Sequence, residues 1–192
     1  MCKSRLIPEL GEKGAAELQA RLVDKIINDL NEFMLCPVEI WQSEETDYFI
    51  TRYCNFEGIT IHTQTGNNLG ERMSNAISST IEKTNKIILI GSDCVLYTKQ
   101  YLTQAIHSLD NTIVVFGPAV DGGYVLLGVS QNIPIIFKDI NWGTDKVLEK
   151  SKENLRSLGV SFSLLDQLWD IDTPSDLNLL RESNPEMMKL TK

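Results

Sequence analysis

Apolar residues that recur every four positions predict an amphipathic helix over residues 15–34. The stripe on its buried face consists of Leu18, Leu22, Ile26, Leu30 and Met34, as expected for a period of 3.6 residues. Similar stripes predict four more helices. One starts near Leu69, one follows a cap at Thr98, one covers residues 144–158, and one follows a cap at Thr173 with Pro174 in its first turn.

Short apolar runs between these helices predict strands. Residues 87–90, Ile-Ile-Leu-Ile, lie between Lys86 and Gly91. Such a run is typical of a strand that is buried on both faces at the centre of a parallel sheet covered by helices. Further strands are expected over residues 38–41, 59–62, 112–116, 124–129 and 160–165. The pattern predicts an α/β domain, and we expect the tail 185–192 to fray.

Polar residues directly follow the central strand. Because ligands of open α/β sheets bind beyond the carboxyl ends of the strands, Asp93 is placed to hold a metal ion or a substrate hydroxyl. It is equally consistent with a simple turn or cap. Gly66 and Gly70 surround a predicted helix start, where backbone amides suit a phosphate or a base edge, although an ordinary cap explains them as well.

A second group of candidate residues follows the strand expected over residues 112–116. Asp121 precedes Gly122 and Gly123, which favours a tight turn between strands. Alternatively, Asp121 shares a pocket with Asp93, and the two glycines leave room for a sugar or phosphate.

Composition limits the function classes. The 192 residues, 42% of them hydrophobic, suit one domain. A net charge of -8 argues against nucleic acid as a partner. The four cysteines show neither a Cys-x-x-Cys pair nor zinc-like spacing, and no apolar run approaches the roughly 20 residues that span a bilayer. We therefore expect a cytoplasmic protein without a membrane partner.

Six segments, in order along nearly the whole chain, resemble the DUF2064 group of glycosyltransferase-A-type proteins, the arsenosugar-biosynthesis-associated glycosyltransferases. They are Lys3-Ser-Arg-Leu, Gln64-Thr-Gly-Asn-Asn-Leu-Gly-Glu-Arg-Met, Gly91-Ser-Asp-Cys, Gly117-Pro-Ala-Val-Asp-Gly-Gly-Tyr, Trp142-Gly-Thr and Trp169-Asp-Ile-Asp-Thr-Pro-Ser-Asp-Leu. The resemblance implies a nucleotide-diphospho-sugar transferase (GT-A, Rossmann-like) fold, with a mostly parallel sheet between helices in a single domain, 1–192. The nucleotide is expected over the carboxyl edge of the sheet.

The resemblance also implies roles for individual residues. Asp93 and Asp172 match the positions that bind a divalent metal in relatives, here Mg²⁺ or Mn²⁺. The nucleotide-binding residues would be Lys3, Arg5, Gln64, Gly66, Leu69, Gly70, Arg72 and Ser92, with Lys3 and Arg5 neutralising phosphate charge. Gly122, Gly123, Tyr124 and Trp142 would bind the acceptor, and Asp121 would act as the general base.

Two departures from the family pattern stand out. Relatives begin with an apolar strand and a Pro- and Gly-containing loop ahead of the Lys-x-Arg-Leu segment, whereas this chain starts two residues before Lys3. The first strand is therefore expected to be missing, with unpaired backbone groups as the consequence. In addition, Val95 and Leu96 stand where relatives carry Pro and a polar residue.

Three functions fit this sequence. The first is a metal-dependent glycosyltransferase that moves a sugar from a nucleotide diphosphate to a small acceptor. The second is a nucleotidyltransferase that uses a nucleoside triphosphate and releases pyrophosphate. The third is a non-catalytic remnant or binding scaffold. The sequence leaves the base, the sugar, the acceptor and a homodimeric state open.

Overall fold

The computed structural model describes residues 3–43, 47–53 and 56–188. Its helices are α1 (Ile7–Phe33), α2 (Asp47–Tyr53), α3 (Leu69–Ile81), α4 (Lys99–Ser108), α5 (Val147–Ser157) and α6 (Pro174–Ser183). Its strands are β1 (Val38–Gln42), β2 (Ile59–Thr63), β3 (Ile87–Ile90), β4 (Val114–Pro118), β5 (Tyr124–Val129) and β6 (Phe162–Leu164). Three short 3-10 helices complete it: η1 (Ser4–Leu6), η2 (Pro134–Phe137) and η3 (Pro185–Met188).

The strands form two sheets. A four-stranded sheet has the order β3-β5-β4-β6, and β1 pairs with β2 in a separate sheet. The β1–β2 and β4–β6 pairs are parallel, whereas β5 runs antiparallel to both β3 and β4. The expected α/β class, with sheets between helices, is confirmed, but β5 makes the larger sheet less parallel than the pattern suggested.

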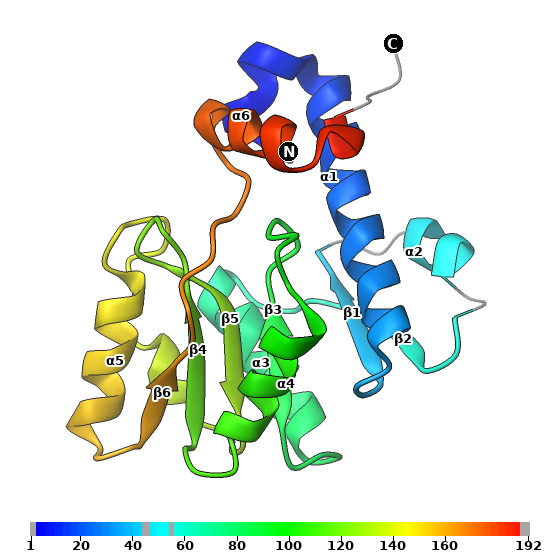
Figure 1. The fold of residues 1–192 in the computed structure, drawn as a ribbon. Coiled ribbons are helices and arrows are strands. Elements are labelled where there is room, and N and C mark those ends of the chain that lie inside the picture. Colours follow the sequence, from blue (N-terminus) through cyan, green and yellow to red (C-terminus); the bar gives the residue numbers. More distant parts are fainter. Residues whose placement is uncertain (1–2, 44–46, 54–55, 189–192) are drawn as a thin grey trace.

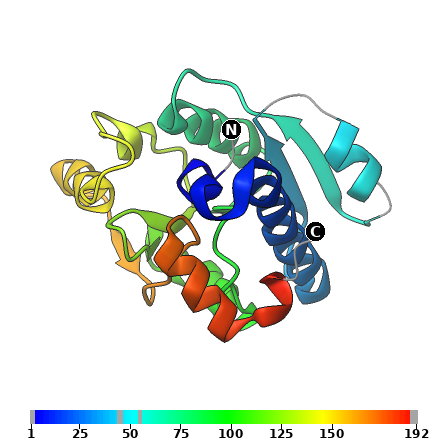
Figure 2. The same cartoon turned by 90° about the horizontal axis from the view of Figure 1, so that it is seen from above.

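Each face of the four-stranded sheet carries its own apolar core because side chains alternate along a strand. On one face, α1, α4 and α6 cover Val115 and Leu126. On the other, α3, η2 and α5 cover Phe116 and Leu127. Figure 1 shows the long α1 beside the sheets and α6 above them, and Figure 2, seen from above, shows α6 next to the start of α1.

The prediction for the run 87–90 is half right. It forms the strand β3, but β3 lies at the edge of its sheet, pairs only with the antiparallel β5, and keeps all four side chains partly exposed. By contrast, β4 and β5 are almost entirely buried. A four-residue apolar run predicts a buried strand. It does not predict which strands pair with it, because that depends on segments distant in the sequence.

Several helices begin or end at other residues than the apolar periodicity predicts. The first helix begins at Ile7 rather than residue 15, with a break at Gly11, whose φ of 69° lies outside the helical region. Helix α2 was not predicted. The tail expected to fray starts with η3, whose Met187 packs against the core; residues 189–192 are not described. None of the described helices is long and apolar enough to cross a membrane.

Candidate functional site

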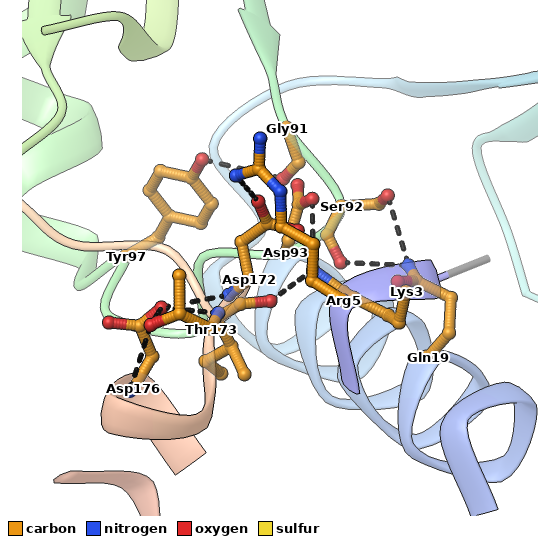
Figure 3. A network of polar contacts seen from close by, with 11 residues as sticks. Lys3, Arg5, Gln19, Gly91, Ser92, Asp93, Tyr97, Asp172, Thr173 and Asp176 are labelled. Carbon is orange, nitrogen blue, oxygen red and sulfur yellow. Dashed lines mark hydrogen bonds and ion pairs between the residues drawn. The ribbon is translucent and has the colours of Figure 1, made fainter. Parts of the chain in front are cut away.

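The loop after β3 is tied to the segment before α6 and to the start of the chain. The Asp93 carbonyl accepts a hydrogen bond from the Ile171 amide at 3.0 Å. The Lys3 ammonium donates to Asp93 Oδ2 at 3.0 Å and to the Ile171 carbonyl. Only 3% of the Lys3 side chain is exposed, against 41% of the Asp93 side chain. The cation is thus enclosed while the carboxylate still reaches solvent (Figure 3).

A second ion pair lies beside the first. Arg5 Nη1 donates to Asp172 Oδ2 at 2.7 Å, and both side chains are exposed to solvent in large part. The backbone around Asp172 is fixed because Asp176 Oδ2 accepts from the amides of Asp172 and Thr173. Thr173 and Asp176 form a capping box at the start of α6, which confirms the predicted cap at Thr173.

The two predicted metal ligands therefore come from segments that lie side by side, and Figure 3 shows Asp93 and Asp172 in one polar cluster with Lys3 and Arg5. Each carboxylate is paired with a cation from the first residues of the chain. Over residues 3–43, 47–53 and 56–188 no group of three or more histidine, cysteine or acidic side chains is arranged to hold a metal. The metal role of this carboxylate pair remains a prediction.

Ser92 also belongs to this cluster. Its carbonyl and its hydroxyl both accept hydrogen bonds from Gln19 Nε2, at 3.3 and 3.2 Å. Gln19 lies on α1 and was not singled out in the sequence, because its position on a helix face carries no motif. It connects the helix that follows Lys3 to the loop that carries Asp93.

Asp170 is a site residue that the sequence reasoning overlooked. Burial raises the pKa of its carboxyl, and the charges of Asp121 and then Asp93 raise it further, while Lys3 opposes the shift. Asp121 and Asp93 thus lie close enough to Asp170 to share one negative field. The available signal was the Asp-Ile-Asp spacing, which places a second carboxylate two residues before Asp172.

The Gly122 turn is a hairpin connection. Asp121 Oδ1 accepts from the Gly123 amide at 2.9 Å, and β4 and β5 pair on either side. Gly122 has a φ of 89°, and a Cβ there would lie 2.1 Å from the Asp145 carbonyl oxygen. The backbone of Asp145 therefore fills the space expected for a sugar or phosphate at Gly122. This position supports the turn interpretation instead.

Tyr124 points into the core. Its ring lies against Phe116, with centroids 5.3 Å apart. Its buried hydroxyl lies beside the buried Ser151 hydroxyl of α5. Burial raises the pKa of Tyr124. Its expected place on an acceptor surface is not where the structure puts it.

The start of α3 is capped by its own side chains. Asn68 Oδ1 accepts from the Glu71 amide at 2.9 Å, and Glu71 Oε2 accepts from the Asn67 amide at 2.8 Å. The Glu71 carboxylate thus accepts a hydrogen bond from a backbone amide that could otherwise bind a phosphate. Gly66 permits a close turn, because a Cβ there would lie 2.8 Å from Glu71 Cβ.

The other residues predicted for the nucleotide surround this helix start. Arg72 Nε donates to the Gly66 carbonyl at 3.2 Å, and Gln64 Nε2 donates to the Trp41 carbonyl at 2.8 Å. The Trp142 ring lies so close to Gly70 that a Cβ there would be 2.8 Å from it. Leu69 is 52% exposed. The structure therefore brings Trp142, predicted for the acceptor, against the predicted nucleotide loop.

Comparison with known proteins identifies the family of this chain. The model of the family DUF2064, described as an uncharacterized protein conserved in bacteria, matches residues 26–144. The chain belongs to this family. The matched part includes Asp93, Asp121 and the start of α3, whereas Lys3, Arg5 and Asp172 lie outside it. No curated protein matches the sequence.

Solved structures show the same fold. A proposed nucleotide-diphospho-sugar transferase from Desulfovibrio desulfuricans G20 is similar with a TM-score of 0.84 and 26% identity, over 98% of this chain and 84% of that one. The 4-diphosphocytidyl-2C-methyl-D-erythritol synthase from Anaerococcus prevotii DSM 20548 is similar with a TM-score of 0.63 and 6% identity, over 84% of each chain. The DUF2064 chain thus has the nucleotide-diphospho-sugar transferase fold, as expected.

Proposed function

We propose that this DUF2064 protein is a divalent-metal-dependent glycosyltransferase that moves a sugar from a nucleotide diphosphate to a small acceptor. One observation carries the proposal: the loops of Asp93 and Asp172 are bonded together at the carboxyl end of β3, with Lys3 and Arg5 on their carboxylates. Paired carboxylates beside paired cations suit a metal diphosphate. The similarity to the Desulfovibrio protein supports the choice of donor.

The residues present fit a hard divalent cation. The Asp93 and Asp172 side chains are 41% and 39% exposed, so their oxygens can be reached from solvent. Asp170 lies two residues before Asp172, and burial, followed by the charges of Asp121 and Asp93, raises the pKa of its carboxyl. Asp93 and Asp172 would hold Mg²⁺ or Mn²⁺, which prefers oxygen ligands and keeps several waters. A bound cation supplies Lewis-acid stabilisation of the leaving diphosphate.

The side chains of the chain itself supply the rest. Arg5, whose side chain is exposed, would contact the developing charge on the leaving diphosphate, and the enclosed Lys3 would stabilise that charge without contacting it. Both are then worth more in the transition state than in the ground state. The bond from the sugar carbon to the diphosphate oxygen breaks, and a bond to the acceptor oxygen forms. The acceptor proton passes to a carboxylate. Asp121 would fill this role.

The nucleotide lies against the start of α3 in this proposal. The exposed Leu69 and the half-buried Trp142 supply an apolar and aromatic surface for the base. Gln64 and Arg72 supply polar groups beside it. The acceptor then approaches from the side of Asp121 and Gly123.

Calorimetric titration of Mn²⁺ with a nucleoside diphosphate tests the proposal. We expect Asp93→Asn to lower the Mn²⁺-dependent affinity at least about tenfold, because one anionic ligand is lost. Asp110→Asn is the matched control: it makes the same charge change at an exposed pair with Lys86 on the helix-α4 side of the molecule. Equal affinities of Asp93→Asn and the unmodified protein would remove the metal role of Asp93.

Nucleotidyl transfer is the second candidate, favoured by the fold similarity to 4-diphosphocytidyl-2C-methyl-D-erythritol synthases. Both reactions use the same carboxylates and differ in the bond that breaks. Incubation with nucleotide sugars and with nucleoside triphosphates separates them. Release of a nucleoside diphosphate indicates sugar transfer, and release of pyrophosphate indicates nucleotidyl transfer. Metal-dependent nucleotide binding with neither product would instead indicate a binding scaffold.

A further inference from the structure

Helix α1 contacts the loop after β3 through a single side chain, Gln19. Its amide nitrogen Nε2 lies 3.3 Å from the Ser92 carbonyl oxygen and 3.2 Å from Ser92 Oγ. The two residues are 73 positions apart in the chain, so only the fold brings them together. Figure 3 shows both contacts beside the polar cluster that contains Lys3 and Asp93.

The Ser92 carbonyl determines which end of the Gln19 amide faces the loop. A carbonyl oxygen can only accept hydrogen bonds, so the Gln19 atom next to it must be the nitrogen and not the amide oxygen. That nitrogen carries two hydrogens, one for the carbonyl and one for Ser92 Oγ. The Ser92 hydroxyl oxygen therefore accepts a hydrogen bond from Gln19.

This polarity leaves the Ser92 hydroxyl hydrogen available for another partner. A hydroxyl has one hydrogen, and an oxygen that accepts from one side directs that hydrogen elsewhere. Within the described residues, no hydrogen bond has the Ser92 hydroxyl as its donor. Ser92 is exposed, so a ligand can reach this hydrogen from solvent.

The backbone on both sides of Ser92 is held in place as well. The Gly91 amide donates to the Val125 carbonyl of β5 at 2.9 Å. The Asp93 carbonyl accepts from the Ile171 amide at 3.0 Å. The loop is thus attached to β5, to the segment before α6 and, through Gln19, to α1.

Helix α1 holds Gln19 against the core. Its neighbours Leu18 and Leu22 are fully buried, and Gln19 itself is half-buried. A side chain that is already ordered loses less conformational entropy when a ligand binds. Gln19 and Ser92 therefore form a preorganised pair in which only the Ser92 hydroxyl hydrogen is free to bind.

We propose that Gln19 is a positioning residue that directs the Ser92 hydroxyl hydrogen to a phosphate oxygen of a bound nucleoside diphosphate. Ser92 is the neighbour of Asp93, where the proposed function places a metal diphosphate. A hydroxyl that donates to an anionic oxygen makes a short, charge-assisted hydrogen bond. The inference rests on the proposed function, because it needs the diphosphate to bind beside Asp93.

Calorimetric titration with ADP, CDP, GDP and UDP in the presence of Mn²⁺ tests this role, and the diphosphate that binds the unmodified protein most tightly is then used for the variants. Ser92→Ala should weaken its binding at least about tenfold, because a hydrogen bond to a charged group is lost. Gln19→Met keeps the length of the side chain but removes the donor. It should weaken binding at least about threefold, because the hydroxyl hydrogen is no longer directed to the ligand.

The double variant separates positioning from a general effect on the fold. In the Ser92→Ala background, Gln19→Met should change the affinity less than about twofold, because no hydroxyl remains to be directed. Gln104→Met is the matched control: it makes the same change at an exposed position of α4, and the affinity should stay the same.

The outcomes distinguish this inference from the proposed function. If none of the four diphosphates binds the unmodified protein, the proposed function fails and the inference fails with it. If one binds, and Ser92→Ala or Gln19→Met binds it equally well, only the inference is overturned. Equal losses from Gln19→Met in the presence and absence of the Ser92 hydroxyl would also overturn it, because Gln19 would then act by another route.

Discussion

Replacing Lys3 by methionine tests how the cluster is held together. Methionine keeps most of the aliphatic packing of a side chain that is only 3% exposed, but it removes the ammonium. The Ile171 carbonyl then loses its donor, and the Asp93 carboxylate loses its counter-ion. Water can replace the ammonium at Asp93, which is 41% exposed, more readily than at the buried carbonyl.

The expected loss of stability follows from these two contacts. A hydrogen bond to a charged group contributes about 1.5–3 kcal/mol, and solvent at Asp93 reduces that pair toward the value of a surface ion pair, below about 1 kcal/mol. The free energy of unfolding should therefore fall by about 2–3 kcal/mol. For a chain of this size the Tm should fall by about 5–10 °C.

Urea unfolding followed by circular dichroism measures this change. Lys13→Met is the matched control, because it removes the same charge from an exposed position on α1; a shift within about 0.5 kcal/mol is expected there. A similarly small loss for Lys3→Met would refute the view that the enclosed ammonium joins the Asp93 loop to the segment before α6.

Two further substitutions test the hairpin and the core. Gly122→Ala should lower the free energy of unfolding by at least about 2 kcal/mol, because its Cβ would meet the Asp145 backbone at a φ of 89°; Gly143→Ala, also at positive φ but with open space around it, should lose less. Burial raises the pKa of the Cys94 thiol to about 11, so stability is fully present below about pH 9 and falls as pH rises toward 11. Cys94→Ala should reduce the fall of the unfolding free energy between pH 9 and pH 11, measured by urea titration at each pH. An unchanged fall would contradict the raised pKa of Cys94.

Helix caps and apolar stripes could be predicted from the sequence, because they depend on residues close together along the chain. The caps at Thr98 and Thr173 are present, with Thr98 Oγ1 accepting from the Tyr101 amide at 3.1 Å. The apolar stripe of α3 and the runs of β3 and β5 also form the elements expected of them. These features depend on side-chain spacing over a few residues, so periodicity is enough to find them.

The candidate site was found only in part. The motifs pointed to Asp93 and Asp172, and the structure places their loops in contact. They did not show that Lys3 and Arg5 pair with these carboxylates, that Asp170 joins the same negative field, or that Tyr124 turns inward. Each of these facts depends on a segment distant in the chain.

The sequence by itself determined the class of fold, the identity of most helices and strands, and the loops in which carboxylates and glycines gather. Only the tertiary structure decided that β3 lies at an edge rather than at the centre, and that Asp145 occupies the space beside Gly122. The physical reason is the range of the forces involved. Helix periodicity and caps are set by neighbours along the chain, whereas strand pairing, close packing and charge clusters are set by residues that meet only after the chain has folded.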